Sequence, residues 1–265
     1  MNLRKYILNN FISRLSKILN FKMSIRSEVK LNQIINSIIT NKQIKRNGFT
    51  LSNYGIWMFD NYNDKTFRFS IMGYRNNLEK ILLSVNEPNI FIDVGANQGV
   101  FSIIAAKNKN FIEIHAFEPN LNIISYLERN FLFNKVSNFF IHKVAIGQQS
   151  TSLSFFVPEN HSGNGRISSE NSNMQVKCIN RDYLNKVFIQ SCESYFIKID
   201  VEGSEFDVLN ELFNSSISLL IKYIFIEINT RFSDKDVLIK ILQDNGFCEK
   251  FRRGNEVSYD ALYVR

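Results

Sequence analysis

The chain has 265 residues, 45% of them apolar, and its 32 lysines and arginines against 25 acidic residues give a formal net charge of +7. This length and composition predict a globular protein with a full-sized core. The three cysteines form no C-x-x-C pair, which argues against a disulfide framework or a zinc site and suits a reducing cytoplasm. No run of 18 uncharged apolar residues occurs, so the sequence predicts no membrane-spanning helix.

The basic charge is concentrated in residues 1–50, which hold ten lysines and arginines against one acid, Glu28. Apolar residues recur at helical spacing between Ile7 and Leu19, and a second helical pattern covers 29–40. We therefore expect residues 1–47 to form a basic, amphipathic helical extension. It could pack on the rest of the chain or on a second subunit, or residues 1–25 could hold the protein at the inner face of an anionic membrane.

Residues 48–265 are expected to form a second domain with alternating strands and helices. Residues 48–73 predict antiparallel strands that turn near 61–64. Segment 148–178 interrupts the later alternation and predicts a hairpin and a loop over the active site. The pattern as a whole predicts an α/β fold with a mostly parallel, seven-stranded sheet and helices on both faces. The expected strands lie near 90–94, 112–117, 138–145, 195–200, 221–228, 246–251 and 258–264, and the expected helices near 99–108, 121–133, 179–187, 205–213 and 233–244.

A glycine turn in segment 91–102 joins an apolar strand to a helix. Gly95 and Gly99 lack a Cβ, so this loop can adopt positive φ and let a ligand approach the main chain. Asp93 places a carboxylate at the end of the strand, where open α/β sheets bind their ligands. The dinucleotide fingerprint G-x-G-x-x-G is absent. The turn therefore disfavours a nicotinamide or flavin cofactor.

A second carboxylate, Glu118, ends the next apolar strand, and Pro119 stops that strand. One helix and one strand separate Asp93 from Glu118, which is the spacing that brings an acidic residue to a ribose bound over the first strand. No nearby segment is suited to bind phosphates. The ligand is therefore expected to be a nucleoside without phosphates, which S-adenosylmethionine fits.

Four motifs in order resemble the FkbM-type family of class I methyltransferases, which have a Rossmann-like fold. They are Asp93-Val-Gly-Ala-Asn-Gln-Gly99, Phe117-Glu-Pro119, Ala145-Ile-Gly147 and Lys198-Ile-Asp-Val-Glu-Gly-Ser-Glu205. The resemblance covers roughly residues 48–265. It implies S-adenosylmethionine as cofactor, with these residues in contact with it: Asp93, Gly95, Ala96, Asn97, Gly99, Glu118, Pro119, Ala145 and Asp200.

The last of these motifs places charge in a buried strand. Strand alternation puts Lys198, Asp200 and Glu202 on one side. A buried charge is costly unless it is paired, so we expect Lys198 to be neutralised by one of these carboxylates or by Glu227 on the neighbouring strand. Asp200 is expected beside the first cofactor loop.

Methyl transfer to an alcohol is assisted by a general base, and three residues are candidates for it. They are Glu202, Glu227 and His161, the last of which lies in the polar, glycine-rich loop 158–166. His115 and His142 fall within predicted strands and are interpreted as core residues. No metal is expected, although Asp200, Glu202 and Glu227 could together coordinate magnesium as an alternative.

Three functions remain open, and the resemblance favours O-methylation of a hydroxyl on a saccharide or another small metabolite. A nucleic-acid methyltransferase would use the basic region 1–50 to bind its substrate, but N-P-P-[FYW], D-P-P-Y and Pro-Cys motifs are absent and residues 51–265 are nearly neutral. We therefore expect no nucleic-acid partner. A non-catalytic binding module that keeps the fold is the third possibility, and the intact motif residues disfavour it.

Overall fold

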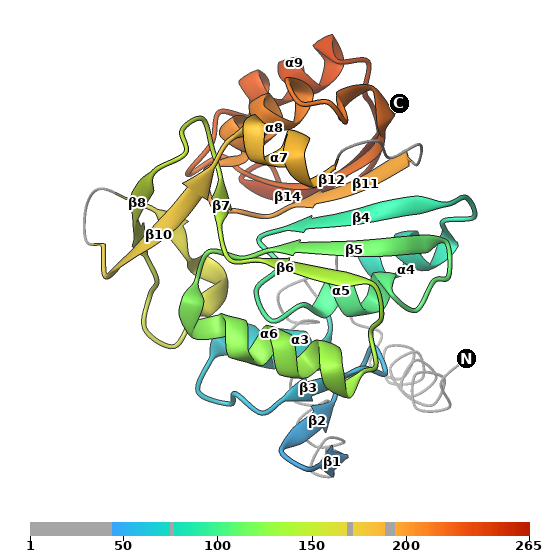
Figure 1. The fold of residues 1–265 in the computed structure, drawn as a ribbon, viewed down its shortest axis with the longest axis vertical. Helices are drawn as coiled ribbons and strands as arrows, with labels where there is room; N and C mark the ends of the chain where they lie inside the picture. Colours follow the sequence, from blue (N-terminus) through green and yellow to red (C-terminus); the bar gives the residue numbers. More distant parts are fainter. Residues whose placement is uncertain (1–43, 75–76, 169–171, 189–193) are drawn as a thin grey trace, which may run out of the picture. The chain divides into compact units, whose positions relative to one another are not determined.

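The computed structural model describes residues 44–74, 77–168, 172–188 and 194–265. Lys45–Arg265 form one compact unit, drawn in colour in Figure 1. The helices predicted near 7–19 and 29–40 lie outside the described residues. Within the described part of the chain, no helix combines the length and the apolar character needed to cross a bilayer.

A seven-stranded sheet forms the centre of this unit, with the order β13-β14-β12-β11-β4-β5-β6 (Figure 1). Five neighbouring strands run parallel, and β14 runs antiparallel to both of its neighbours. The predicted mostly parallel, seven-stranded sheet is confirmed. Its strands are β4 (Asn89–Val94), β5 (Phe111–Phe117), β6 (Phe139–His142), β11 (Ser194–Ile199), β12 (Ile221–Asn229), β13 (Cys248–Gly254) and β14 (Ser258–Val264).

Helices cover both faces of the sheet, because alternate residues of the central strands are apolar on both sides. Ile90 and Ile92 of β4 face one apolar core and Phe91 faces the other. One face carries α7 (Arg181–Val187), α8 (Glu205–Phe213) and α9 (Lys235–Asp244) (Figure 1). The opposite face carries α3 (Lys65–Met72), α4 (Leu78–Ser84), α5 (Val100–Ala105) and α6 (Leu121–Phe133).

The segment before the sheet differs from the prediction in two elements. Strands β1 (Lys45–Arg46), β2 (Phe49–Leu51) and β3 (Trp57–Phe59) form the expected antiparallel sheet. Residues 65–72, however, form α3 rather than a strand, because Asp64 caps the helix by accepting a hydrogen bond from the Thr66 amide. The helix α4 was not predicted.

Segment 139–179 differs from the prediction in its first strand only. The strand predicted near 138–145 divides into β6 and β7 (Ala145–Ile146), and β7 joins a smaller sheet of order β7-β10-β8-β9. That sheet contains β8 (Ser152–Phe156), β9 (Arg166–Ile167) and β10 (Met174–Ile179), and the 3₁₀ helix η2 (Ser162–Asn164) follows β8. The predicted hairpin is therefore confirmed, and it lies beside the carboxyl ends of β4 and β5 (Figure 1).

Candidate active site

A cavity of about 560 Å³ opens at the carboxyl ends of β4, β5 and β11. A volume of this size is typical of a small-molecule site, and open parallel sheets bind their ligands at this edge. The four predicted catalytic residues, Asp200, Glu202, Glu227 and His161, all line it. So do the predicted cofactor residues Gly95, Ala96, Asn97, Glu118, Pro119 and Ala145.

The glycine turn after β4 packs directly against the turn after β11. A Cβ on Gly95 would lie 1.9 Å from the carbonyl oxygen of Asp200, so only glycine fits here, and its φ is +77°. The amides of Gly95 and Ala96 both donate to the carbonyl oxygen of Phe117 at 3.0 Å. The ends of β4, β5 and β11 are thereby held together at the cavity.

Two of the predicted cofactor residues lie behind the loop and do not line the cavity. A Cβ on Gly99 would lie 2.4 Å from Cδ1 of Leu127, so this glycine lets α5 approach α6 closely. Asp93 is fully buried, accepts a hydrogen bond from Ser102 Oγ at 2.7 Å and forms an ion pair with Lys198. These two residues therefore support the conformation of the loop rather than line the cavity.

Glu118 is the carboxylate that faces the cavity from the end of β5, and it is only 5% exposed. Its two oxygens accept hydrogen bonds from the amides of Asn97 at 2.7 Å and Asn120 at 2.8 Å. Each carboxylate oxygen has a second lone pair, so Glu118 can still accept from ligand hydroxyls. Burial raises the pKa of Glu118 to about 7, although its two amide donors act in the opposite direction.

Lys198 is buried at the centre of the site. It pairs with Asp200, which was one of the expected partners, and with Asp93, which was not. Its Nζ lies 3.1 Å from Asp93 Oδ1 and 3.5 Å from Asp200 Oδ2, and it donates to the carbonyl oxygen of Gly95 at 2.9 Å. Among the described residues it forms no ion pair with Glu227. Burial alone would lower the pKa of Lys198, but the two aspartates together outweigh it and raise the pKa.

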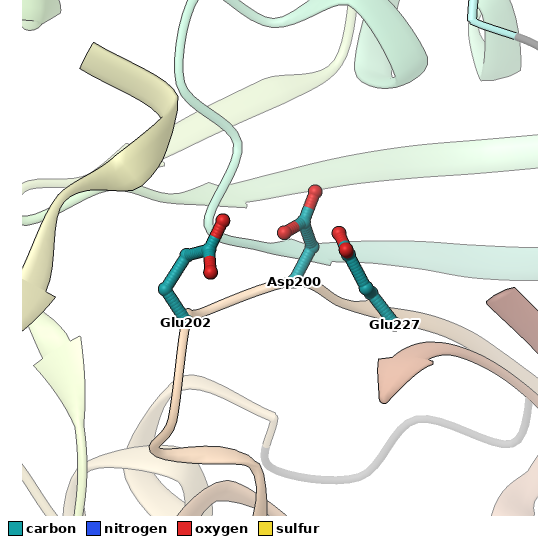
Figure 2. A group of neighbouring side chains, drawn as sticks. All are labelled: Asp200, Glu202 and Glu227. Atoms are coloured by element: carbon teal, nitrogen blue, oxygen red, sulfur yellow. The ribbon is translucent and has the colours of Figure 1, made fainter. Parts of the chain in front are cut away.

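The three predicted carboxylates of the reaction centre lie together. Asp200 and Glu202 follow β11, Glu227 comes from β12, and Figure 2 shows their side chains on the same side of the backbone. Each offers an oxygen within 4.8 Å of the others. This is a spacing at which a divalent cation could be held, but neighbouring carboxylates without a cation retain protons instead.

The electrostatics of the cluster separate its members. Burial, followed by the charges of Asp200 and Glu205, raises the pKa of Glu202 to about 7, while Arg166 acts in the opposite direction. Repulsion by Asp200, with burial second, raises the pKa of Glu227 well above its usual range. Near neutral pH, Glu227 therefore carries a proton and Glu202 is close to the midpoint of its titration.

The backbone at Glu202 is also unusual. Its φ is +52°, in the left-handed region that residues other than glycine seldom adopt, and Gly203 follows with φ +111°. Such conformations are retained where the surroundings fix them, often at functional sites. In this turn the conformation directs the Glu202 side chain toward Asp200 and Glu227 (Figure 2).

The loop between β8 and β9 forms the wall opposite the sheet, and we call residues 158–165 the lid. His161 and Asn164 of the lid line the cavity. Within the described part of the chain, Nδ1 of His161 is buried and has no hydrogen-bond partner. A catalytic histidine usually has its second nitrogen fixed by a neighbour, so the geometry favours the carboxylates over His161 as the base.

Two further histidines lie in the core, as predicted. His115 and His142 are buried, their rings stack, and Nδ1 of His115 lies 3.0 Å from Nε2 of His142. Nδ1 of His142 in turn lies 3.0 Å from the Tyr183 hydroxyl. Neither histidine lines the cavity.

Sequence reasoning missed the contribution of α3 to the site, because it interpreted this segment as a strand. Thr66, Phe69 and Ser70 of this helix, and Tyr74 just after it, line the cavity. An aspartate shortly before apolar residues at helical spacing, here Phe67 and Ile71, is compatible with a helix N-cap, and that signal at Asp64 could have revealed the helix. The cavity-lining residues Arg253 and Asp260, from β13 and β14, had no signal in the sequence.

Comparisons with known proteins agree with this geometry. The profile of the "Methyltransferase FkbM domain" family matches residues 93–248. The chain belongs to this family. Methyltransferase 1 of Beauveria bassiana is 23% identical over 188 residues, which cover 63% of this chain and 75% of that protein. Hexuronic acid methyltransferase AglP of Haloferax volcanii is 28% identical over 173 residues, which cover 63% of this chain and 67% of that protein.

Among solved structures, M. jannaschii TYW2 in complex with AdoMet is 14% identical to this chain, with a TM-score of 0.43. The match covers 83% of this chain and 88% of that one.

The cofactor of this FkbM-domain methyltransferase is S-adenosylmethionine. The cavity fits a nucleoside without phosphates, because its basic lining residues are Lys198 and Arg253, and Lys198 is already paired with two aspartates. Glu118 lines the cavity at the end of β5, where it would offer an acceptor for ribose hydroxyls. The loop formed by Gly95, Ala96 and Asn97 would hold the remainder of the cofactor.

Proposed function

We propose that the protein methylates a hydroxyl oxygen on a saccharide or a similar polyhydroxylated metabolite. One observation carries the proposal: a single cavity joins the cofactor loop and Glu118 to the carboxylates Asp200, Glu202 and Glu227. A base next to the methyl donor is what an alcohol acceptor requires, since an alcohol is a weak nucleophile until its proton is removed.

The three carboxylates have different functions in this proposal. The bound cofactor supplies an electrophilic methyl group. Glu202 accepts the proton of the acceptor hydroxyl, because a pKa of about 7 suits a general base at neutral pH. Glu227, which retains its proton, donates a hydrogen bond to the acceptor, and Asp200 stays in its ion pair with Lys198. Orientation of the hydroxyl in this polar wall contributes up to roughly 7–11 kcal/mol.

Aromatic side chains that line the same cavity support a saccharide acceptor. Phe69 and Tyr74 line the cavity, and their ring centroids are 6.5 Å apart. Phe69 is 43% exposed, so its ring is accessible to a ligand in the cavity. A sugar ring has an apolar face for these aromatic rings and hydroxyls for the carboxylates of the same cavity. The relative named a hexuronic acid methyltransferase supports the same class of acceptor.

The test is methyl transfer from radiolabelled S-adenosylmethionine to a panel of acceptors. The panel contains methyl glycosides of uronic acids, neutral hexoses and amino sugars, together with transfer RNA and a polyamine. We expect label in a base-stable ether on a saccharide, lost in Glu202→Gln. Label only in transfer RNA or on an amine would contradict the proposal.

A further inference from the structure

Asp64, the N-cap of α3, connects three segments that are far apart in the sequence. Its Oδ1 accepts from the amides of Thr66 at 2.9 Å and Ser162 at 3.1 Å. Its Oδ2 accepts from Ser162 Oγ at 2.5 Å and from Gln98 Nε2 at 3.1 Å. Asp64 is 6% exposed, so these donors take the place of water around a buried carboxylate.

Ser162 extends this connection to the cofactor loop. Asn97 Nδ2 donates to Ser162 Oγ at 3.1 Å, and Ser162 Oγ donates to Asp64. A chain of hydrogen bonds therefore runs from Asn97, whose amide is bound by Glu118, through the lid to the start of α3. The side chains of Asn97 and Ser162 both line the cavity.

Backbone contacts fix the lid in the same place. The Lys65 amide donates to the carbonyl oxygen of Asn160 at 2.8 Å, and the Gly163 amide donates to Thr66 Oγ1 at 2.7 Å. A Cβ on Gly163 would lie 2.8 Å from Thr66 Oγ1, so the lid contacts α3 at its closest approach. Within the described ranges no lysine, arginine or histidine forms an ion pair with Asp64. Its charge is stabilised by these hydrogen-bond donors and by the N-terminus of α3.

We propose that Asp64 is a positioning residue of the cofactor site. It holds Ser162 of the lid against Asn97 and Gln98 of the cofactor loop, so that the lid forms part of the cofactor-binding surface. Cofactor affinity then depends on a carboxylate that does not itself line the cavity. The proposal rests on the cofactor alone and does not require that the acceptor be a saccharide.

The test uses S-adenosylhomocysteine as the probe, with calorimetry as the measurement. Asp64→Ser keeps a helix-capping hydroxyl but is too short to reach Ser162 and Gln98. Ser162→Ala removes the bridging hydroxyl, whereas Ser162→Thr retains it. We expect Asp64→Ser and Ser162→Ala each to weaken binding about tenfold, the effect of losing a charge-assisted hydrogen bond. Ser162→Thr should remain within about twofold, because it rescues the contact.

The double variant distinguishes one network from two separate effects. If Asp64 and Ser162 act together, Asp64→Ser with Ser162→Ala should weaken binding little more than either change alone. Amide hydrogen exchange in residues 158–165 should become faster in all variants that lack the contact. Both results are independent of which acceptor the enzyme uses.

Asp234 provides a matched control, since it caps α9 by accepting from the amides of Asp236 and Val237 and does not line the cavity. Asp234→Ser should leave affinity for S-adenosylhomocysteine unchanged at a similar melting temperature. The proposal is overturned if Asp234→Ser weakens binding as much as Asp64→Ser does. It is also overturned if Ser162→Ala, correctly folded by circular dichroism, binds as tightly as the unmodified protein, or if the two effects are additive.

Discussion

Replacing Glu118 by glutamine should weaken cofactor binding while leaving the fold intact. The carboxylate accepts from the amides of Asn97 and Asn120, and a glutamine has one acceptor oxygen in place of two. One loop amide would then face an NH₂ group, and the cofactor would lose an ionised acceptor. A hydrogen bond to a charged group is worth about 1.5–3 kcal/mol, so the dissociation constant should rise about 10- to 150-fold.

The pH dependence provides a second, independent test of the same residue. Because the pKa of Glu118 is raised to about 7, its ionised fraction rises about tenfold between pH 6 and pH 8. The ionised form is the better acceptor, so affinity for S-adenosylhomocysteine should rise over this interval in the unmodified protein and stay flat in Glu118→Gln. Calorimetry at pH 6, 7 and 8 measures both quantities.

Glu128→Gln is the matched control, because Glu128 lies on the surface of α6 in an exposed ion pair with Lys143 and does not line the cavity. It should keep the affinity and the pH profile of the unmodified protein. Binding by Glu118→Gln within about twofold of that protein, with the same rise between pH 6 and pH 8, would refute the assignment of Glu118 to the cofactor.

Four further results are expected. Glu202→Gln should lower turnover by roughly 10²-fold or more while cofactor affinity is retained; full turnover in this variant with none in His161→Ala would move the base to the lid. Glu227→Gln should raise the melting temperature above pH 7, because the folded protein must keep Glu227 protonated at a pH where the unfolded chain releases that proton, and glutamine needs no proton; a lower melting temperature would contradict this. The free energy of unfolding, measured by calorimetry, should fall as the pH rises from 5 to 8. The pKa values of Glu118 and Glu202 are raised in the folded protein, so in this range it holds protons that the unfolded chain has released. Methyl transfer should survive dialysis against EDTA; loss of activity that magnesium restores would show that the carboxylates hold a cation.

The strand, turn and helix that line one side of the cofactor cavity could be predicted because their sequence signals are local. An apolar strand, a glycine turn and a helical pattern follow one another between 89 and 105, and none of them needs a distant partner to be recognised. Gly95 shows why this works. Its positive φ and its contact with the Asp200 carbonyl leave no room for a side chain, so this geometry requires a glycine that can be recognised in the sequence.

Helix α3 shows where local signals fail. Phe67, Phe69 and Ile71 alternate with polar residues, which is the period of a strand. The structure instead buries Thr66, Phe67, Ser70 and Ile71 on one side of a helix. The cap residue Asp64 also accepts hydrogen bonds from Ser162 of the lid, about one hundred residues away in the chain, and no window of sequence contains both partners.

The carboxylate that pairs with Lys198 could be predicted only from the strand order and the register of the sheet. Strand β11 lies between β4 and β12, and its register places Lys198 opposite Asp93 on β4 and opposite the apolar Phe225 on β12. Alternation along one strand gives the side of the sheet on which a residue lies, but it does not give the neighbour across from it. Glu227 therefore remained an equal possibility until the register was known.

This pairing has a direct consequence for the reaction centre. Since Lys198 is already bound by Asp93, Asp200 and the carbonyl oxygen of Gly95, its charge does not offset Glu202 and Glu227 fully. Those two glutamates lie beside Asp200 and are partly buried, and both have raised pKa values. If Lys198 were paired with Glu227, as the sequence allowed, it would lower the pKa of Glu227 and so make that carboxylate a weaker base. In the proposed mechanism, the ion pair that Lys198 forms with Asp93 and Asp200 thus leaves Glu202 with a raised pKa, as a base for an alcohol near neutral pH requires.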